Sequence, residues 1–211
     1  MPDELKSFTP PILGMVPDVQ PRSVQQHGEK SVFASRVDSM NITIQSPAPM
    51  LLQPGTNTAI PVNADTTHYN LFVLNDIDLQ TFAPFIFPAN RALTEHMGDG
   101  VDAGFAALDE AAIARIKRFP SLFANENKYT GHAGEGQLLG LGFVKQIKAR
   151  QHMGVKIYPD IRYLIPQQRL NEALFELDLR GSDSLNEFDR THWCIKKIDL
   201  IAELRELGFN I

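Results

Sequence analysis

The chain has 211 residues and 43% of them are hydrophobic, which is enough for one large domain or two small ones with a sizeable core. The formal net charge of −5 argues against a protein coated in nucleic acid, although it leaves room for a local basic site. The single cysteine, Cys194, excludes an intramolecular disulfide and a cysteine-rich metal site. Because no signal peptide is visible and no apolar run approaches the roughly 20 residues that span a bilayer, we expect a cytoplasmic protein without membrane contact.

Residues 1–67 are expected to form an N-terminal extension with a few short β segments. Most of the 14 prolines lie in the N-terminal half of the chain, and Pro10 and Pro11 favour an extended path. Isolated apolar residues over 12–16 have no helical or strand period. They predict an arm that docks on a protein partner or on a second copy of the chain, and the alternative is a disordered arm.

The compact domain is expected to span residues 68–211. Leu71–Leu74 is a continuous β-prone apolar run, which is typical of a central strand. Residues 108–118 carry acidic side chains at the start and basic ones at the end, which favours a helix. A strand over 191–197 and a final helix that begins after Asp199 complete the predicted elements.

The best-patterned stretch predicts a β-hairpin followed by a helix. Apolar and polar side chains alternate over residues 141–150, which indicates a half-buried strand. Gly154 can take the positive φ of a turn, and residues 155–158 resume the strand pattern. Pro159 is expected to end regular pairing because it lacks an N–H, and residues 166–177 show the apolar spacing of one helix face.

The local charge of this stretch is opposite to that of the whole chain. Residues 141–169 hold six basic side chains and one acidic side chain, so they carry +5 while the remainder carries −10. One interpretation is a solvated strand face whose lysines prevent edge-to-edge aggregation. The other is a surface that binds phosphate or an acidic partner. The candidate contact residues of this hairpin are Lys145, Lys148, Arg150, Lys156 and Arg162. A second recognition surface is predicted near the last strand, because Arg and Trp are favoured in binding sites, and it consists of Arg190, His192 and Trp193.

Two loops invite a catalytic or metal-binding interpretation. The glycine loop 131–136 precedes a strand, whereas a nucleotide-binding loop follows a strand and opens a helix, so we do not expect nucleotide there. The segment 95–102 contains Glu95, His96, Asp99 and Asp102, which would suit a divalent cation or a hydrolase site. Their spacing matches neither a calcium loop nor a zinc helix, and a polar loop is the favoured interpretation.

His192 and Cys194 lie two residues apart in the predicted strand and therefore share a face. A catalytic pair would need a third orienting group and an oxyanion site, which the neighbouring sequence does not supply. A buried structural thiol is the preferred interpretation. We therefore predict no cofactor, no metal and no catalytic residue.

Five segments resemble an uncharacterised bacterial module that occurs in larger modular proteins, antiviral-defence proteins among them. They are HYNLFV at 68–73, FPANRALTEH at 87–96, RFPSLFANEN at 118–127, IPQQRLNE at 165–172 and RTHWCIKK at 190–197. The resemblance covers about residues 68–211 and implies a non-catalytic part of a larger assembly. It assigns no functional residue.

These observations predict an α+β fold: a small, mostly antiparallel, barrel-like sheet with about three helices packed on one side. The expected function is a non-catalytic binding or regulatory module for protein partners or self-association. The two alternatives are a nucleic-acid-binding module that uses the basic hairpin 141–169 and a hydrolase with an acidic and histidine site near 95–102.

Overall fold

The computed structural model describes residues 51–52, 59–150, 153–182 and 185–211. The predicted N-terminal arm and its strands before residue 51 lie outside these residues. By its contacts the chain divides after Ile44, and all described residues belong to the unit 45–211. The segment predicted as an extension already contributes to this unit, because Leu51–Leu52 (β1) pairs with a long strand of the sheet.

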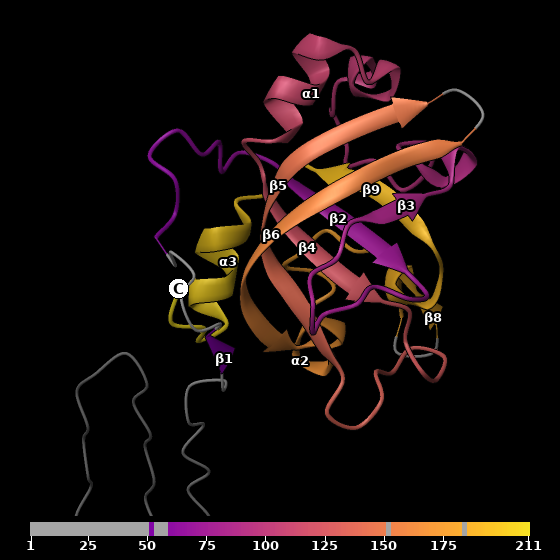
Figure 1. Cartoon of the computed structure of the whole chain (residues 1–211). Coiled ribbons are helices and arrows are strands. Elements are labelled where there is room, and N and C mark those ends of the chain that lie inside the picture. Colours follow the sequence, from indigo (N-terminus) through magenta and orange to yellow (C-terminus); the bar gives the residue numbers. More distant parts are fainter. Residues whose placement is uncertain (1–50, 53–58, 151–152, 183–184) are drawn as a thin grey trace, which may run out of the picture. The chain divides into compact units, whose positions relative to one another are not determined.

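One sheet of seven strands forms the frame of this unit (Figure 1). Six strands run in the order β1-β6-β5-β4-β2-β9, and β3 pairs with β6 beside this path. Apart from β1, the strands are β2 (Tyr69–Leu74), β3 (Phe85–Phe87), β4 (Pro120–Asn125), β5 (Leu138–Arg150), β6 (Gly154–Pro166) and β9 (His192–Lys196). A separate small hairpin joins β7 (Gly181–Ser182) to β8 (Leu185–Asn186).

The predicted α+β class and the mostly antiparallel sheet are confirmed. The strands curl into a half-barrel, and only the pairing of β2 with β4 is parallel among the described strands. The α-helices among the described residues are α1 (Glu110–Ile116), α2 (Gln167–Asn171) and α3 (Leu200–Glu206). The same part of the chain contains the short 3-10 helices η1 (Ala89–Arg91), η2 (Ala103–Ala107) and η3 (Glu187–Asp189).

The helices cover both faces of the sheet, so the prediction that they pack on one side is wrong. Leu170 of α2 and Leu200 of α3 belong to a core cluster with Leu71, whereas Ile116 of α1 belongs to a second cluster with Phe72. Neighbouring residues of a strand point to opposite faces, and β2 is buried on both. A continuous apolar strand therefore needs a cover on each side.

The β5–β6 hairpin is longer than predicted because two irregularities accommodate residues that break the strand pattern. Lys145 has no partner in the register between Val144 and Gln146, so it forms a β-bulge. Pro159 pairs opposite Val144 at this bulge, where the hydrogen-bond ladder is already interrupted, and the strand continues to Pro166. The prediction that Pro159 ends the pairing is therefore wrong.

The helix predicted over 166–177 and the region after α1 also differ from expectation. Helix α2 is only five residues long, and turns follow it, although Leu170, Ala173 and Leu177 are buried as predicted. Strand β4 was not predicted. Its Pro120 occupies the first position of the strand, where a missing N–H is tolerated.

The cap predicted at Asp199 agrees with the structure, and Asp109, which was predicted to lie at the start of its helix, also caps it. The Asp109 carboxylate accepts a hydrogen bond of 2.7 Å from the backbone N–H of Ala112, and Asp199 accepts one of 3.0 Å from Ala202. Among the described residues, no helix has both the length and the apolar character needed to cross a membrane.

Candidate functional site

Three strands place a row of side chains on the outer face of the hairpin tip. Lys148 of β5 stands directly opposite Lys156 of β6, and Lys156 stands opposite Ile86 of β3. The flanking residues Phe85 and Phe87 of β3 point into the core. Because side chains alternate along a strand, Ile86 and Lys156 therefore point away from that core. In Figure 1 strand β3 lies beside the β5–β6 hairpin.

These side chains border a groove of about 300 Å³. Its lining residues are Ile86, Lys148, Arg150, Met153, Gly154, Lys156 and Tyr158. Ile86 and Met153 are unusually exposed for large apolar side chains. The groove thus combines three cationic groups, one phenol ring and two exposed aliphatic side chains.

The cations of the groove have no carboxylate partner among the described residues. None of the ion pairs there involves Lys148, Arg150 or Lys156. The ammonium groups of Lys148 and Lys156 instead lie 5.3 Å and 5.5 Å from the centre of the Tyr158 ring. The two ammonium groups lie near the same ring and belong to residues that are directly opposite in the sheet, so they repel each other. This repulsion falls when an anion binds between them.

Two other predicted basic residues do not join the groove. Lys145 is exposed at the bulge and is not among the lining residues. Arg162 is half-buried, pairs with Asp160 at 2.9 Å, lies over the ring of Phe143 and donates to the carbonyl of Ala59. Arg162 is therefore held by its own neighbours on another part of the hairpin.

The recognition surface expected near β9 is wrong for two of its three members. His192 and Trp193 are both completely buried, because β9 is covered on both faces. The backbone of residues 92–98 also covers the outer edge of β9, where Leu93 donates to the carbonyl of Trp193 and Gly98 to that of Ile195. Arg190 remains half exposed and pairs with Glu95 at 2.8 Å.

The acidic segment 95–102 does not converge on one point. Glu95 bridges Arg91 and Arg190, and although burial opposes its charged form, the bond from Arg91 and both guanidinium charges lower the pKa of Glu95. Asp102 caps η2 and pairs with Arg115 at 3.3 Å. Two of the three carboxylates of this segment, Glu95 and Asp102, are thus committed to separate structural contacts.

The glycine loop 131–136 uses its backbone N–H groups within the protein. Gly131 donates to Asp189, Ala133 donates to the side chain of Gln168, and Gly134 donates to the side chain of Gln137. A phosphate cradle needs free N–H groups that point outward. The backbone of the loop is instead hydrogen-bonded to side chains of η3, of α2 and of the residue that precedes β5.

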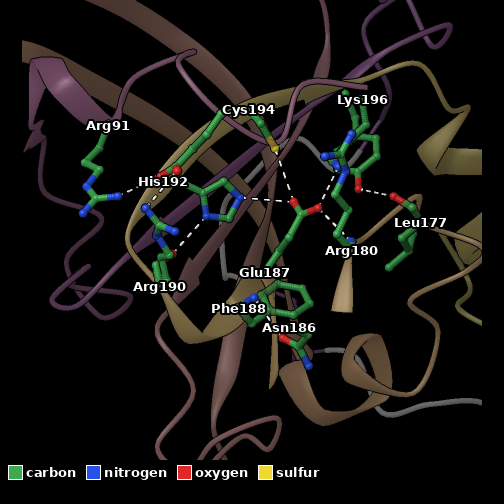
Figure 2. A network of polar contacts seen from close by, with 12 residues as sticks. Arg91, Leu177, Arg180, Asn186, Glu187, Phe188, Arg190, His192, Cys194 and Lys196 are labelled. Carbon is green, nitrogen blue, oxygen red and sulfur yellow. Dashed lines mark hydrogen bonds and ion pairs between the residues drawn. The ribbon is translucent and has the colours of Figure 1, made fainter. Parts of the chain in front are cut away.

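A second polar cluster is buried around the carboxylate of Glu187 (Figure 2). Glu187 is delivered by η3, while His192, Cys194 and Lys196 project from one face of β9 at alternate positions. One oxygen, Oε1, accepts from Lys196 Nζ at 2.9 Å and from the backbone N–H of Arg180 at 2.7 Å. The other oxygen, Oε2, lies 3.2 Å from His192 Nε2 and 3.7 Å from Cys194 Sγ.

The cluster favours an ionised carboxylate and a neutral thiol. Burial opposes ionisation of Glu187, but the bond from His192 and the charge of Lys196 outweigh it and lower the pKa of Glu187. Burial and the charge of Glu187 raise the pKa of Cys194 well above its ordinary value. A neutral, fully buried thiol is not a nucleophile, which agrees with the predicted structural role.

Sequence reasoning found the cations of the groove and missed the rest of it. The alternation of Lys156 and Tyr158 places both side chains on one strand face and was a usable signal for the ring. Ile86 had no signal, because its pairing with Lys156 depends on a contact between distant strands. Glu187 was missed for the same reason, since it comes from a loop outside the strand that carries its partners.

Comparison with profiles of known protein families, with curated protein sequences and with solved structures finds no significant match to this chain.

Proposed function

We propose that the chain is a non-catalytic binding module whose β5–β6 hairpin binds single-stranded nucleic acid in the groove bordered by Lys148, Arg150, Lys156 and Tyr158. The observation that carries this proposal is the cross-strand pair of Lys148 and Lys156, which has no acidic partner among the described residues. Like charges directly opposite in a sheet are destabilising. A phosphate between them turns that repulsion into attraction.

The aromatic and aliphatic side chains favour a single strand over a duplex. Tyr158 stands between the two ammonium groups, and Ile86 and Met153 add exposed apolar surface beside it. Single-strand sites combine a basic groove with a ring on which an unpaired base stacks. A duplex keeps its bases stacked inside and would offer this ring only its backbone.

The other functions predicted from sequence receive less support from the described residues. Self-association through the N-terminal arm concerns residues outside them and stays a prediction. The resemblance to a bacterial module of defence proteins also stays a prediction. A hydrolase near residues 95–102 is disfavoured, because Glu95 and Asp102 are held by arginines.

The direct test is the binding of labelled 15-nucleotide single strands of RNA and DNA to purified protein, followed by fluorescence anisotropy. Replacing Lys148 and Lys156 together by glutamate should abolish binding, because it reverses two of three charges in the groove. Tyr158→Ala should weaken binding by about 1–3 kcal/mol if a base stacks on the ring.

The chain offers a matched control for both changes. Lys128 and Tyr129 are exposed, lie outside the hairpin, and place an ammonium 5.9 Å from a ring centre. Lys128→Glu and Tyr129→Ala should leave the affinity unchanged. Equal affinity of the hairpin variants and the wild type would remove the proposal, and binding of an acidic peptide in place of the oligonucleotides would identify a protein partner.

A further inference from the structure

The buried Glu187 cluster requires a proton or a metal ion between two of its atoms. His192 Nδ1 lies 2.9 Å from the backbone carbonyl of Arg190, which can only accept, so Nδ1 carries a hydrogen. If the ring were neutral, the lone pair of Nε2 would face the carboxylate oxygen Oε2 at 3.2 Å. Either a proton or a metal ion must therefore lie between Nε2 and Oε2.

Two of the three spacings between the potential ligand atoms are close to those of a tetrahedral metal site. Zinc bonds of about 2.3 Å to sulfur and about 2.0–2.1 Å to nitrogen and oxygen place neighbouring ligand atoms about 3.3–3.6 Å apart. The distance from Oε2 to His192 Nε2 is 3.2 Å, and that from Oε2 to Cys194 Sγ is 3.7 Å. One ligand atom from each of the three residues lies within 4.8 Å of the other two.

We propose that Cys194, His192 and Glu187 bind a divalent transition-metal ion of the zinc class. The set of one thiolate, one imidazole and one carboxylate suits zinc, which accepts sulfur, nitrogen and oxygen ligands. The ion displaces the thiol proton of Cys194 and the Nε2 proton of His192, and both protons pass to water. Two positive charges leave and two enter, so the net charge of the buried cluster does not change.

The groups around the three ligands hold them in the geometry that a metal needs. The carbonyl of Arg190 fixes the tautomer of His192 and leaves Nε2 as the ligand atom, a common arrangement for metal-bound histidine. Lys196 and the N–H of Arg180 occupy Oε1, so Glu187 offers only Oε2. The charge of Lys196 is thereby directed to the oxygen that does not bind the metal.

A nearby histidine provides an independent sign that the cluster is incomplete. The ring of His96 lies 5.0 Å from that of His192, and its buried Nδ1 has no hydrogen-bond partner among the described residues. His96 also holds a left-handed backbone conformation, with φ of 56°. A buried polar atom without a partner is costly, so this nitrogen marks an unmet demand for a partner beside the three ligand residues.

The site would be structural, because its three ligands are 3% exposed or less. A closed site of this kind joins η3 to β9 and contributes to the free energy of folding. It lies apart from the groove on the hairpin and does not depend on the proposed function.

The test begins with protein expressed in zinc-supplemented medium and also unfolded and refolded with Co²⁺. We expect about one zinc ion per chain by plasma mass spectrometry. We also expect a thiolate-to-cobalt charge-transfer band in the cobalt form, since Cys194 is the only cysteine. Because binding releases protons, the affinity should fall as the pH is lowered.

Cys194→Ser keeps the size of the side chain. It should lower the metal affinity at least 10-fold and abolish the charge-transfer band. His96→Ala should weaken metal binding less than Cys194→Ser. The control is His132→Ala, which removes an exposed histidine on another loop and should change neither readout. Substoichiometric zinc in folded wild-type protein, or a cobalt spectrum without the thiolate band, would overturn the proposal and leave protons in the cluster.

Discussion

At the scale of single residues, the feature with the largest expected effect on stability is the carboxylate of Glu187, which is buried among several hydrogen-bond donors. Glu187 is 3% exposed and Lys196 is 1% exposed, and neither has water to solvate its charge. Breaking a buried ion pair from one side is strongly destabilising, because the remaining charge loses its compensation. The pair therefore fixes the position of η3 against β9 more than it adds net stability.

Glu187→Gln should reduce the free energy of unfolding by about 3–5 kcal/mol, because it leaves the Lys196 ammonium buried opposite a neutral amide. Lys196→Met should be costly for the same reason. The double variant should lose clearly less than the two single losses added together, as expected for residues in contact. Urea unfolding of the four proteins measures this coupling.

The control for this cycle is Glu95→Gln, which removes a carboxylate that also bridges two cations but lies nearer the surface. Partly exposed ion pairs contribute about 0–1 kcal/mol, so the loss should be small. Equal losses for Glu187→Gln and Glu95→Gln would contradict the account of the buried pair.

The pH dependence of stability should carry the signature of Glu187. The pKa of Glu187 is lowered in the folded chain from an ordinary value of 4.5, so the unfolded chain binds this proton more tightly. The resulting stabilisation is present above about pH 4.5 and is lost as the pH falls through the lower, folded pKa. Thermal unfolding between pH 3 and pH 7 should therefore show a weaker acid loss in Glu187→Gln than in the wild type, and parallel curves would contradict this assignment.

At the scale of elements, the β5–β6 hairpin depends on glycine at a close approach of its two strands. A Cβ atom on Gly142 would lie 2.0 Å from the carbonyl oxygen of Asp160, beside the register shift between Leu141 and Gly142. No side-chain rotation relieves a contact with backbone. The irregular pairing thus selects glycine at this position.

Gly142→Ala should consequently lower the free energy of unfolding by several kcal/mol, since the strands must separate to admit the methyl group. Gly136→Ala is the comparison, because a Cβ there meets open space and only the positive φ of 69° opposes it. That change should cost about 1–2 kcal/mol. Similar losses in the two variants, measured by chemical unfolding, would show that the close contact at Gly142 is relieved.

Local patterns predicted the elements that local rules control. Alternation found β5, the apolar run found β2, and the acidic caps found α1 and α3. Strand β4 was missed because its apolar run follows a proline and precedes a polar loop, and only its parallel pairing with β2 makes it central. The continuation of β6 past Pro159 was missed because a bulge in the partner strand cannot be read from β6 itself.

In the candidate sites too, features set by local sequence patterns could be predicted, and features set by contacts between distant segments could not. Lys148, Arg150 and Lys156 could be predicted as one basic surface, because strand alternation and sequence separation place them on the hairpin. The burial of His192 and Trp193 could not be predicted, since the segment that covers β9 lies about 100 residues earlier in the chain. Contacts of that separation leave no periodic signal in either segment.

At the scale of the whole molecule, the distribution of charge favours the hairpin as the place where the proposed nucleic-acid contact would occur. The chain carries −5, yet residues 141–169 carry +5 and the remainder −10. If the chain binds a nucleic acid as proposed, this stretch would attract the phosphates and the acidic remainder would repel them. Binding should involve few phosphates and should weaken moderately, not steeply, as salt is added.

The measurement that tests the central claim most directly is the salt dependence of single-strand binding in the wild type and in Lys148→Ala/Lys156→Ala. Three cations in the groove predict that log K falls with log[salt] with a slope of about −2, and removal of two lysines should make the slope shallower by about 1.4. Lys128→Ala should keep the wild-type slope. An identical slope in the wild type and the double variant would show that the phosphates bind elsewhere, and the hairpin would then be a solvated face.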